Sequence, residues 1–358
     1  MCIFRRPASP GRFDEVRTDR SGGTPMDQPN KSADESALFL PEYYRDLTVL
    51  HLIGRGRASK VYLVENPAGK KAALKVTMCD TPRMTNSAIR EYAFLQRLSG
   101  SSRVLEGYDF RLESSPRGIM TAWLLEESAQ VLSADDPALT ARDRLAVGVS
   151  VCEAMIDCRR KGIAHLDIKQ SNIFHGLDGV WKVGDFSHSA RSNHLERLHT
   201  AVGSPGYMAP EVYAEHRFSQ RSEIYSTGVL LYRLFAGSMP FKCDAARPCR
   251  AEDECADRAG LSEPLWRILE KATSYRPEDR YPSFEALRGD LRALHTRDLP
   301  SAGEIRSFTR QISGDPLSPG NGGTLPRTMG HTFSFENQAD SPYWYAEETW
   351  STEGAAFD

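Results

Sequence analysis

His165-Leu166-Asp167-Ile168-Lys169-Gln170-Ser171-Asn172, followed after a short gap by Asp185-Phe186-Ser187, is the stretch from which the rest of the chain is interpreted. It places two carboxylates, an ammonium and an amide within about twenty residues of one another. Phosphoryl transfer needs such a set: a carboxylate that orients the incoming hydroxyl, a cation for the migrating phosphate, and oxygens for magnesium. The stretch therefore indicates a phosphoryl-transfer site.

Three further segments stand in the order that one known family requires. Ile53-Gly54-Arg55-Gly56-Arg57-Ala58-Ser59-Lys60-Val61 and Ala72-Ala73-Leu74-Lys75 lie upstream, and Gly203-Ser204-Pro205-Gly206-Tyr207-Met208-Ala209-Pro210-Glu211 lies downstream. With the opening stretch, they resemble the glycine-rich loop, lysine strand, catalytic loop, magnesium loop and end of the activation segment of eukaryotic-type protein kinases. A lone glycine motif would be weak, but five signals in this order make a chance match improbable.

The resemblance implies a role for each polar residue of the site. Asp167 would orient the substrate hydroxyl and accept its proton, and Lys169 would neutralise the γ-phosphate. Asn172 and Asp185 would hold magnesium, while Lys75 would bind the α- and β-phosphates of ATP. Taken singly, Asn172 could be a turn residue and Asp185 a helix cap. At these joint spacings those alternatives are improbable.

The glycine-rich segment is interpreted as a phosphate loop. Gly54 and Gly56 lack Cβ atoms, so backbone N–H groups can approach a triphosphate closely. In isolation a plain hairpin turn would be favoured, but the lysine that follows favours nucleotide binding. The family's third glycine is Ser59 here, which we expect to change loop flexibility more than ATP binding. The residues expected to contact ATP are Ile53, Gly54, Gly56, Ser59, Val61, Ala73 and Lys75.

Glu91 is expected to belong to the same site. Residues 86–98 have helical periodicity, and Glu91 shares one face with Phe94, Leu95 and Leu98. An acid on an otherwise apolar face needs a partner, and the resemblance supplies Lys75. The alternative is an ordinary surface glutamate.

The pattern along the chain changes from strands to helices. Alternating runs at residues 48–53, 60–64, 71–76, 103–112 and 118–125 predict an antiparallel sheet, and an apolar stripe beyond Thr140 predicts helices. The resemblance implies the bilobal α+β protein kinase fold, with a small sheet lobe bearing one helix and a larger, mainly helical lobe. The adenine-binding hinge is expected within residues 122–126.

The domain limits follow from composition and from the resemblance. Residues 1–41 and 298–358 are rich in Gly, Pro, Ser and charge, so both segments are expected to be disordered. Between them, residues 42–297 would form the kinase domain, with lobes at 42–127 and 128–297. Residues 241–260 read as a polar insertion without clear structure.

Composition excludes several other classes of protein. The formal net charge is -3 and the pI is about 6.3, which does not suggest nucleic-acid binding. Seven cysteines without a Cys-x-x-Cys pair favour free thiols over disulfides or zinc. No apolar run is long enough to span a bilayer, and no signal peptide is evident. These features favour the cytoplasm.

Two pairings outside the phosphate site are expected to be structural. His165 would hydrogen-bond backbone rather than carry protons. Glu211 would form a buried ion pair with Arg280, which shapes the substrate-facing loop.

Besides Ser59, three departures from the family matter. Leu166 replaces an arginine, so a phosphate on the activation loop has no such cation to pair with, and activity should not depend on phosphorylation there. Ser187 replaces a glycine, which should restrict the magnesium loop. Glu223 replaces an aspartate and is one methylene longer, which could direct it away from the catalytic-loop backbone. None of these changes removes a group expected to touch phosphate or metal.

The favoured function is an ATP- and Mg²⁺-dependent serine/threonine protein kinase, similar to bacterial members of the family. Lys169 and the residues at 203–206 resemble the serine/threonine branch, and proteins with Ser or Thr hydroxyls would be substrates. The alternative is a weak or inactive nucleotide-binding pseudokinase scaffold. A small-molecule phosphotransferase is disfavoured by residues 203–211. The aromatic and acidic cluster at residues 343–350 could dock a partner or be an unselected end.

Overall fold

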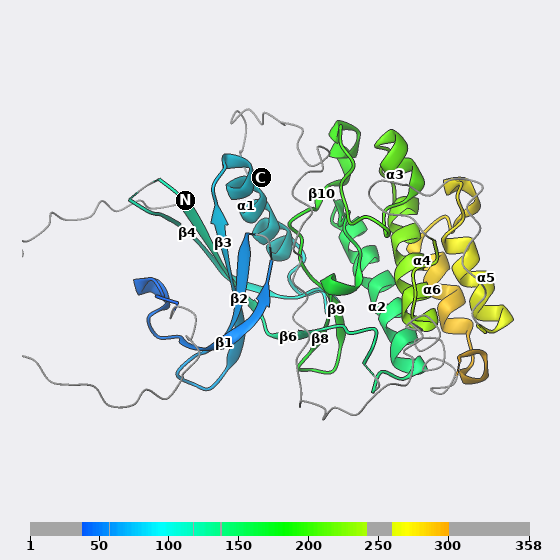
Figure 1. The fold of residues 1–358 in the computed structure, drawn as a ribbon, viewed down its shortest axis with the longest axis horizontal. Helices are drawn as coiled ribbons and strands as arrows, with labels where there is room; N and C mark the ends of the chain where they lie inside the picture. The colour runs from blue at the N-terminus through cyan, green and yellow to red at the C-terminus, as the bar shows by residue number, and fades with distance from the viewer. Residues whose placement is uncertain (1–37, 57, 117, 137, 242–259, 301–358) are drawn as a thin grey trace, which may run out of the picture.

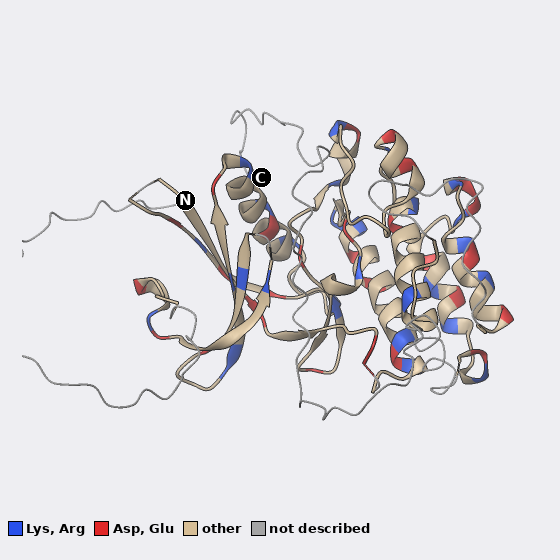
Figure 2. Cartoon of the chain, in the orientation of Figure 1, with Lys and Arg blue, Asp and Glu red and all other residues tan. Residues whose placement is uncertain are grey.

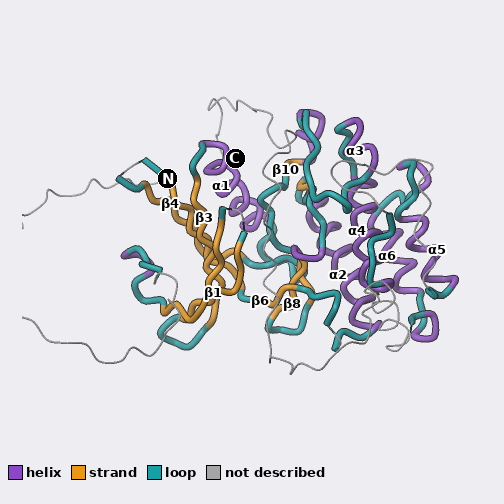
Figure 3. The backbone as a smooth tube through the Cα atoms, viewed as in Figure 1, coloured by secondary structure: helices purple, strands orange, loops and turns teal. Residues whose placement is uncertain are grey.

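The computed structural model describes residues 38–56, 58–116, 118–136, 138–241 and 260–300. These residues form two lobes, one built on a sheet and one mainly of helices (Figure 1). The secondary structure is segregated accordingly, with the long strands on one side and most helices on the other (Figure 3). The bilobal α+β fold expected from the sequence is confirmed.

The small lobe is a five-stranded antiparallel sheet with the order β1-β2-β3-β5-β4. One long helix, α1, lies between this sheet and the large lobe (Figure 1). The elements are η1 (Glu42–Tyr44), β1 (Thr48–Arg55), β2 (Ser59–Glu65), β3 (Lys71–Cys79), α1 (Pro82–Arg97), β4 (Gly107–Ser114) and β5 (Met120–Glu127).

Strand register places four of the nucleotide-site candidates, Gly54, Val61, Ala73 and Lys75, on one face of this sheet. Gly54 pairs with Val61, Val61 with Lys75, and Lys75 with Leu124. Directly paired residues in neighbouring strands point to the same face, and so do residues two apart along a strand. Ala73 and its partner Glu126 therefore lie on the same face as Lys75.

Helix α1 begins four residues earlier than the periodicity predicted. The Thr81 side chain accepts a hydrogen bond from the Met84 N–H (3.3 Å), and Pro82 occupies the first turn, where its missing N–H costs nothing. These start signals precede the apolar stripe, so a search for periodicity alone misses the first turn. Glu91 lies on the buried face, as expected.

Two expectations about the strands near the lobe junction are corrected. The strand expected from residue 103 begins at Gly107, because Arg103 and Leu105 form backbone hydrogen bonds with Val183 instead. The crossing between lobes lies at Ser128, after the expected hinge window. Strand β5 stays in the small sheet to Glu127, and the next strand pairs within the large lobe.

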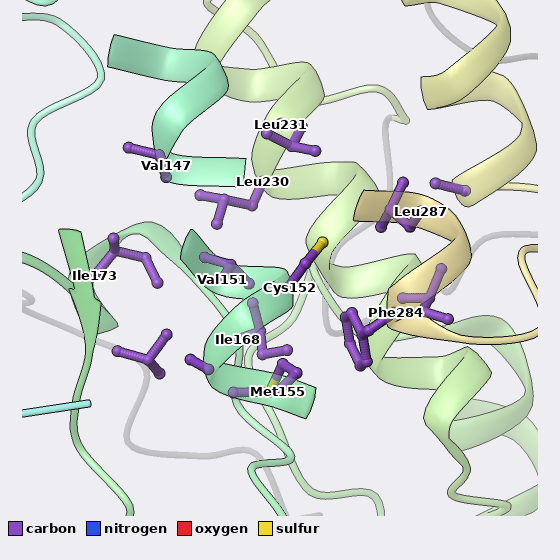
Figure 4. Packing of buried hydrophobic residues seen from close by; sticks show 14 of the residues in the cluster. Val147, Val151, Cys152, Met155, Ile168, Ile173, Leu230, Leu231, Phe284 and Leu287 are labelled. Carbon is purple, nitrogen blue, oxygen red and sulfur yellow. The ribbon is translucent and has the colours of Figure 1, made fainter. Parts of the chain in front are cut away.

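The large lobe packs its helices around α2. Apolar side chains of α2 meet those of α4 and α6 in one buried cluster, in which Val151, Leu230 and Leu287 are all fully buried (Figure 4). Its elements are β6 (Ala129–Val131), α2 (Ala141–Arg160), β7 (Ile163–Ala164), η2 (Gln170–Asn172), β8 (Ile173–Gly176), β9 (Trp181–Val183), β10 (Ala190–Arg191), η3 (Ser192–Arg197), α3 (Pro210–Glu215), α4 (Gln220–Ala236), α5 (Glu263–Ala272), η4 (Pro277–Asp279), α6 (Phe284–Ala293) and η5 (Thr296–Asp298).

The packed region extends slightly beyond the expected limits of 42 and 297. Leu38 and Leu40 contact the outer cluster of the small lobe, and Leu299 contacts the core of the large lobe. The expected disorder of the remaining end segments, most of the 241–260 insertion and the cluster at 343–350 lie outside the described residues. Cys79, Cys152 and Cys158 are free and buried, as expected. No helix in the described ranges is long and apolar enough to cross a membrane.

Candidate active site

Two small antiparallel pairings in the large lobe present the catalytic and metal loops. Strand β7 pairs with β10, and β8 pairs with β9, so the loop after β7 lies beside the loop after β9. Leu166 and Asp185 have φ angles of 67° and 59°. Such left-handed backbone is unfavourable for these residues and is held by the surrounding contacts.

The Asp167 carboxylate accepts hydrogen bonds from several sides. Ser204 Oγ donates to Oδ1 (2.7 Å), Lys169 Nζ lies 2.7 Å from Oδ2, and Asn172 Nδ2 donates to Oδ2 (3.3 Å). Burial acts to raise the pKa of Asp167, but Lys169 and His188 outweigh it, so the pKa is lowered. The carboxylate is therefore ionised and fixed in orientation.

Lys75 joins the two lobes through carboxylates. Its Nζ lies 2.7 Å from Glu91 Oε1 on α1 and 3.2 Å from Asp185 Oδ1 on the loop after β9. Burial acts against the charged form, but Asp185 and Glu91 outweigh it and raise the pKa of Lys75. The ammonium thus stays charged on the sheet face that carries Val61 and Leu124.

Asp185 and Asn172 offer oxygens that suit a hard divalent cation. Burial acts to raise the pKa of Asp185, but Lys75 and the Ser187 hydroxyl hold it below its usual range. Asn172 Nδ2 donates to the Asp167 carbonyl (2.8 Å), which turns the amide oxygen away from that bond. Carboxylate and amide oxygens are the ligands that Mg²⁺ prefers, so the donor set fits the ion.

The glycine-rich turn is closed by a backbone hydrogen bond from Gly56 N–H to the Ser59 carbonyl (2.7 Å). A Cβ on Gly56 would lie 2.8 Å from Ser59 Oγ, so a side chain there would press on the serine. Ile53, just before the turn, is exposed, whereas Ala73 on β3 is buried. Gly54, Gly56, Ser59 and Val61 thus lie in or beside this turn, and Lys75 pairs with Val61 on the neighbouring strand.

One expectation about the departures from the family is wrong. Glu223 is not directed away from the catalytic loop: its Oε1 accepts hydrogen bonds from the N–H groups of His165 (2.7 Å) and Leu166 (3.2 Å). Ser187 has no positive φ, and the left-handed residue of this loop is Asp185. The Ser187 hydroxyl donates to Asp185 Oδ1 (2.7 Å). The restriction of the loop expected from the Ser187 side chain stays a prediction.

The two structural pairings are present. His165 is fully buried, and its Nε2 lies 3.1 Å from the Gly184 carbonyl. Glu211 and Arg280 form two parallel hydrogen bonds (2.8 and 2.9 Å) with both side chains buried. The His165 contact joins the catalytic loop to the metal loop, and the Glu211–Arg280 pair joins α3 to the segment that follows η4.

Sequence reasoning missed several residues that border the site. Ser204 lies in the expected end of the activation segment without an assigned role, yet its Oγ donates to Asp167 Oδ1 and accepts from Lys169 Nζ (2.9 Å). His188 Nδ1 lies 3.7 Å from Asp167 Oδ2. Glu126 shares the face of Lys75, and burial raises its pKa to about 8 although Lys75 acts to lower it. Of these three residues, only Glu126 had a signal in the sequence, because it lies within the window expected for the hinge.

The fold and the site define a class of protein. A small sheet lobe holds a lysine paired to a helix glutamate, and a helical lobe holds an ordered aspartate beside a second, cation-suited aspartate. This is the arrangement of phosphotransferases that bind ATP between two lobes. The family model for the protein kinase domain matches residues 47–290, more than half of the chain. The chain belongs to the protein kinase family.

Curated relatives agree with this assignment. The chain is 31% identical over 248 residues to CBL-interacting protein kinase 4 of Oryza sativa subsp. japonica, covering 64% of this chain and 53% of the relative. It is 26% identical over 281 residues to serine/threonine-protein kinase PknB of Mycobacterium tuberculosis (73% and 45%). For serine/threonine-protein kinase Pkn1 of Myxococcus xanthus the identity is 28% over 265 residues (68% and 38%). The chain thus spans about half the length of these relatives or less.

Proposed function

We propose that this chain is a serine/threonine protein kinase that transfers the γ-phosphate of ATP to hydroxyl groups of proteins. The observation that carries the proposal is the presence of two ionic clusters, Lys75 with Glu91 and Asp185, and Asp167 with Lys169. A pseudokinase scaffold is characterised by loss of such a group, and none is lost here.

The residues divide the reaction between the two lobes. Lys75, held by Glu91, would bind the α- and β-phosphates under the glycine-rich turn, with Val61 and Ala73 against the base. Asp185 and Asn172 would hold Mg²⁺, which supplies positive charge to the phosphate oxygens when bound.

Asp167 and Lys169, in the large lobe, would act on the substrate hydroxyl and on the transferred phosphate. Asp167 would orient the substrate hydroxyl and accept its proton as the oxygen bonds to the γ-phosphorus and the bond to ADP breaks. Lys169, within hydrogen-bond reach of Asp167, would neutralise the charge on the transferred group.

The remaining assignments are proposals of the same kind. The kinase domain comprises about residues 42–297, divided at residue 128, with flanking segments on both sides. The free buried thiols support a reducing, cytoplasmic compartment. The composition of residues 343–350 supports a docking role for that cluster.

Purified protein incubated with labelled ATP, magnesium and a generic basic protein tests the proposal. We expect transfer by the wild type and a loss of about 100- to 1000-fold in Asp185→Asn and in Lys75→Met, because each removes a transition-state contact. Nucleotide-induced thermal stabilisation without any transfer would instead support the scaffold. Wild-type rates in Asp185→Asn with magnesium would overturn the site assignment.

A further inference from the structure

A hydrogen bond joins helix α1 directly to the metal loop of the other lobe. Ser87, in the first half of α1, donates from its Oγ to the backbone carbonyl of Ser187 (2.7 Å). Ser87 and Ser187 are 100 positions apart in the chain, and both are partly buried. Because α1 faces the large lobe (Figure 1), this contact bridges the lobe junction.

This bond completes a closed ring of polar contacts. From Ser187, the Oγ donates to Asp185 Oδ1 (2.7 Å), which also lies 3.2 Å from Lys75 Nζ. Lys75 in turn lies 2.7 Å from Glu91 Oε1. Glu91 and Ser87 are four residues apart on α1, so they lie one above the other on the same side of the helix. The ring therefore fastens one turn of α1 to the loop at two points.

The ring also directs the Asp185 carboxylate. Oδ1 accepts from both the Ser187 hydroxyl and the Lys75 ammonium, so this oxygen is already engaged. The same carboxylate is the proposed metal ligand, and two donors on one oxygen fix the direction of the other. A glycine at position 187 would keep the carbonyl that Ser87 uses but would remove the donor to Asp185.

We propose that Ser87 and Ser187 are positioning residues that together hold α1 and the metal loop in the arrangement needed for phosphoryl transfer. Leu166 offers no cation to a phosphate on the activation segment, and the ring supplies an attachment between the lobes that requires no phosphate. The inference rests on the proposed kinase function and names the contacts that order its site.

Ser87→Ala removes the contact on α1 while leaving Glu91 and Lys75 in place. We expect kcat to fall about fivefold, the effect of one lost neutral hydrogen bond, and Ser87→Thr to restore most of it because it keeps the hydroxyl. Ser99→Ala, an exposed serine beyond the end of the same helix, is the matched control and should leave kcat unchanged. A loss in Ser87→Ala that Ser87→Thr does not restore would overturn the proposal.

Ser187→Ala tests whether the two serines act as one unit. It removes the donor to Asp185 but keeps the backbone carbonyl, so we expect a loss of about fivefold in kcat and a higher magnesium requirement. In the Ser87→Ala, Ser187→Ala double variant the losses should be clearly smaller than the product of the single losses, because the ring is already open. If the loss of kcat in the double variant equals the product of the two single losses, the two serines do not act as one unit.

A binding measurement separates this inference from the proposed function. If the wild type transfers no phosphate, the kinase proposal fails, but the ring can still be tested by thermal stabilisation with ATP and magnesium. Stabilisation should be smaller in Ser87→Ala and Ser187→Ala than in the wild type and Ser99→Ala, while the unfolding midpoints without nucleotide stay close. Equal stabilisation in all four proteins would overturn the inference.

Discussion

At the scale of single residues, Ser204 connects the activation segment to the catalytic loop. It accepts from Lys169 Nζ and donates to Asp167 Oδ1, so one hydroxyl orients both groups. We expect Ser204→Ala to lower kcat by about tenfold or more with little change in stability, since hydrogen bonds to charged groups are stronger than neutral ones.

Steady-state kinetics with a peptide substrate measures this effect. Ser204→Thr keeps the hydroxyl and is the matched control, expected to retain most activity. If Ser204→Ala and Ser204→Thr lose activity equally, the hydroxyl is not the group that matters.

We expect a second residue, Glu223, to make the stability of the protein depend on pH. Burial raises its pKa to about 7, although the backbone N–H groups of Leu166 and His165 act to lower it. An unfolded glutamate titrates near about 4.3, so between these values the folded state binds more protons than the unfolded state. The contribution of Glu223 to the free energy of unfolding therefore decreases as pH rises from about 4.3 to about 7.

Glu223→Gln keeps an oxygen acceptor but cannot ionise. Urea unfolding of both proteins from about pH 5 to about pH 8 should show the variant gaining stability relative to the wild type as pH rises. A difference between the two proteins that stays constant over this range would contradict the assignment.

At the scale of elements, the Glu211–Arg280 pair ties α3 to the segment that follows α5. The Arg280 side chain is fully buried, and it also donates to the carbonyls of Ser274 and Tyr275. We expect Arg280→Met to lower the free energy of unfolding by about 3 to 5 kcal/mol, because Glu211 is left as an unpaired buried charge. Urea unfolding followed by fluorescence measures the change.

Two comparisons isolate the buried charge. Adding Glu211→Gln to Arg280→Met should recover part of the loss, since no unpaired carboxylate remains. Arg267→Ala breaks an exposed pair with Glu263 and should change stability by about 0.5 kcal/mol or less. If Arg280→Met costs no more than Arg267→Ala, the pair does not hold these elements together.

At the scale of the whole molecule, the two lobes are joined without a phosphorylated residue. Ser87 and Lys75 reach the metal loop directly, and Leu166 provides no cation for a phosphate. We expect the Ser192→Ala, Thr200→Ala variant to keep its rate within about twofold of the wild type, and phosphatase treatment to have as little effect.

Ser187 and Ser189 are left out of that variant because their hydroxyls have structural partners, Asp185 and the His165 carbonyl. Transfer rates before and after phosphatase treatment provide the measurement. A large loss in the variant would mean that another basic residue, such as Arg191 or Arg197, binds a phosphate in this segment.

Basic and acidic residues are interspersed over the described part of the large lobe and are not separated into patches of one sign. Basic and acidic positions alternate along the helices of the large lobe (Figure 2). Because the formal net charge is only -3, we attribute the order of the site to local hydrogen bonds and ion pairs rather than to the electrostatic field of the whole protein.

The sequence by itself determined the fold family, the order of the elements and the identity of the polar groups at the site. These properties depend on residue types at short spacings: glycines in one turn, alternation along strands, and the aspartate, lysine and asparagine of one loop. Even the pairing of Lys75 with Glu91 could be anticipated, since an acid on an apolar helix face needs a partner and the family resemblance supplied Lys75.

Only the tertiary structure decided which distant groups meet. Ser87 and Ser187 are 100 positions apart, Ser204 and Asp167 are 37 apart, and Glu223 and Leu166 are 57 apart. A hydrogen bond requires its atoms within a few tenths of an ångström of about 2.9 Å, and such distances are set by packing and rotamers rather than by residue type. For that reason the sequence could suggest that the longer Glu223 side chain is directed away from the catalytic loop. In the structure its carboxylate nevertheless accepts hydrogen bonds from that loop.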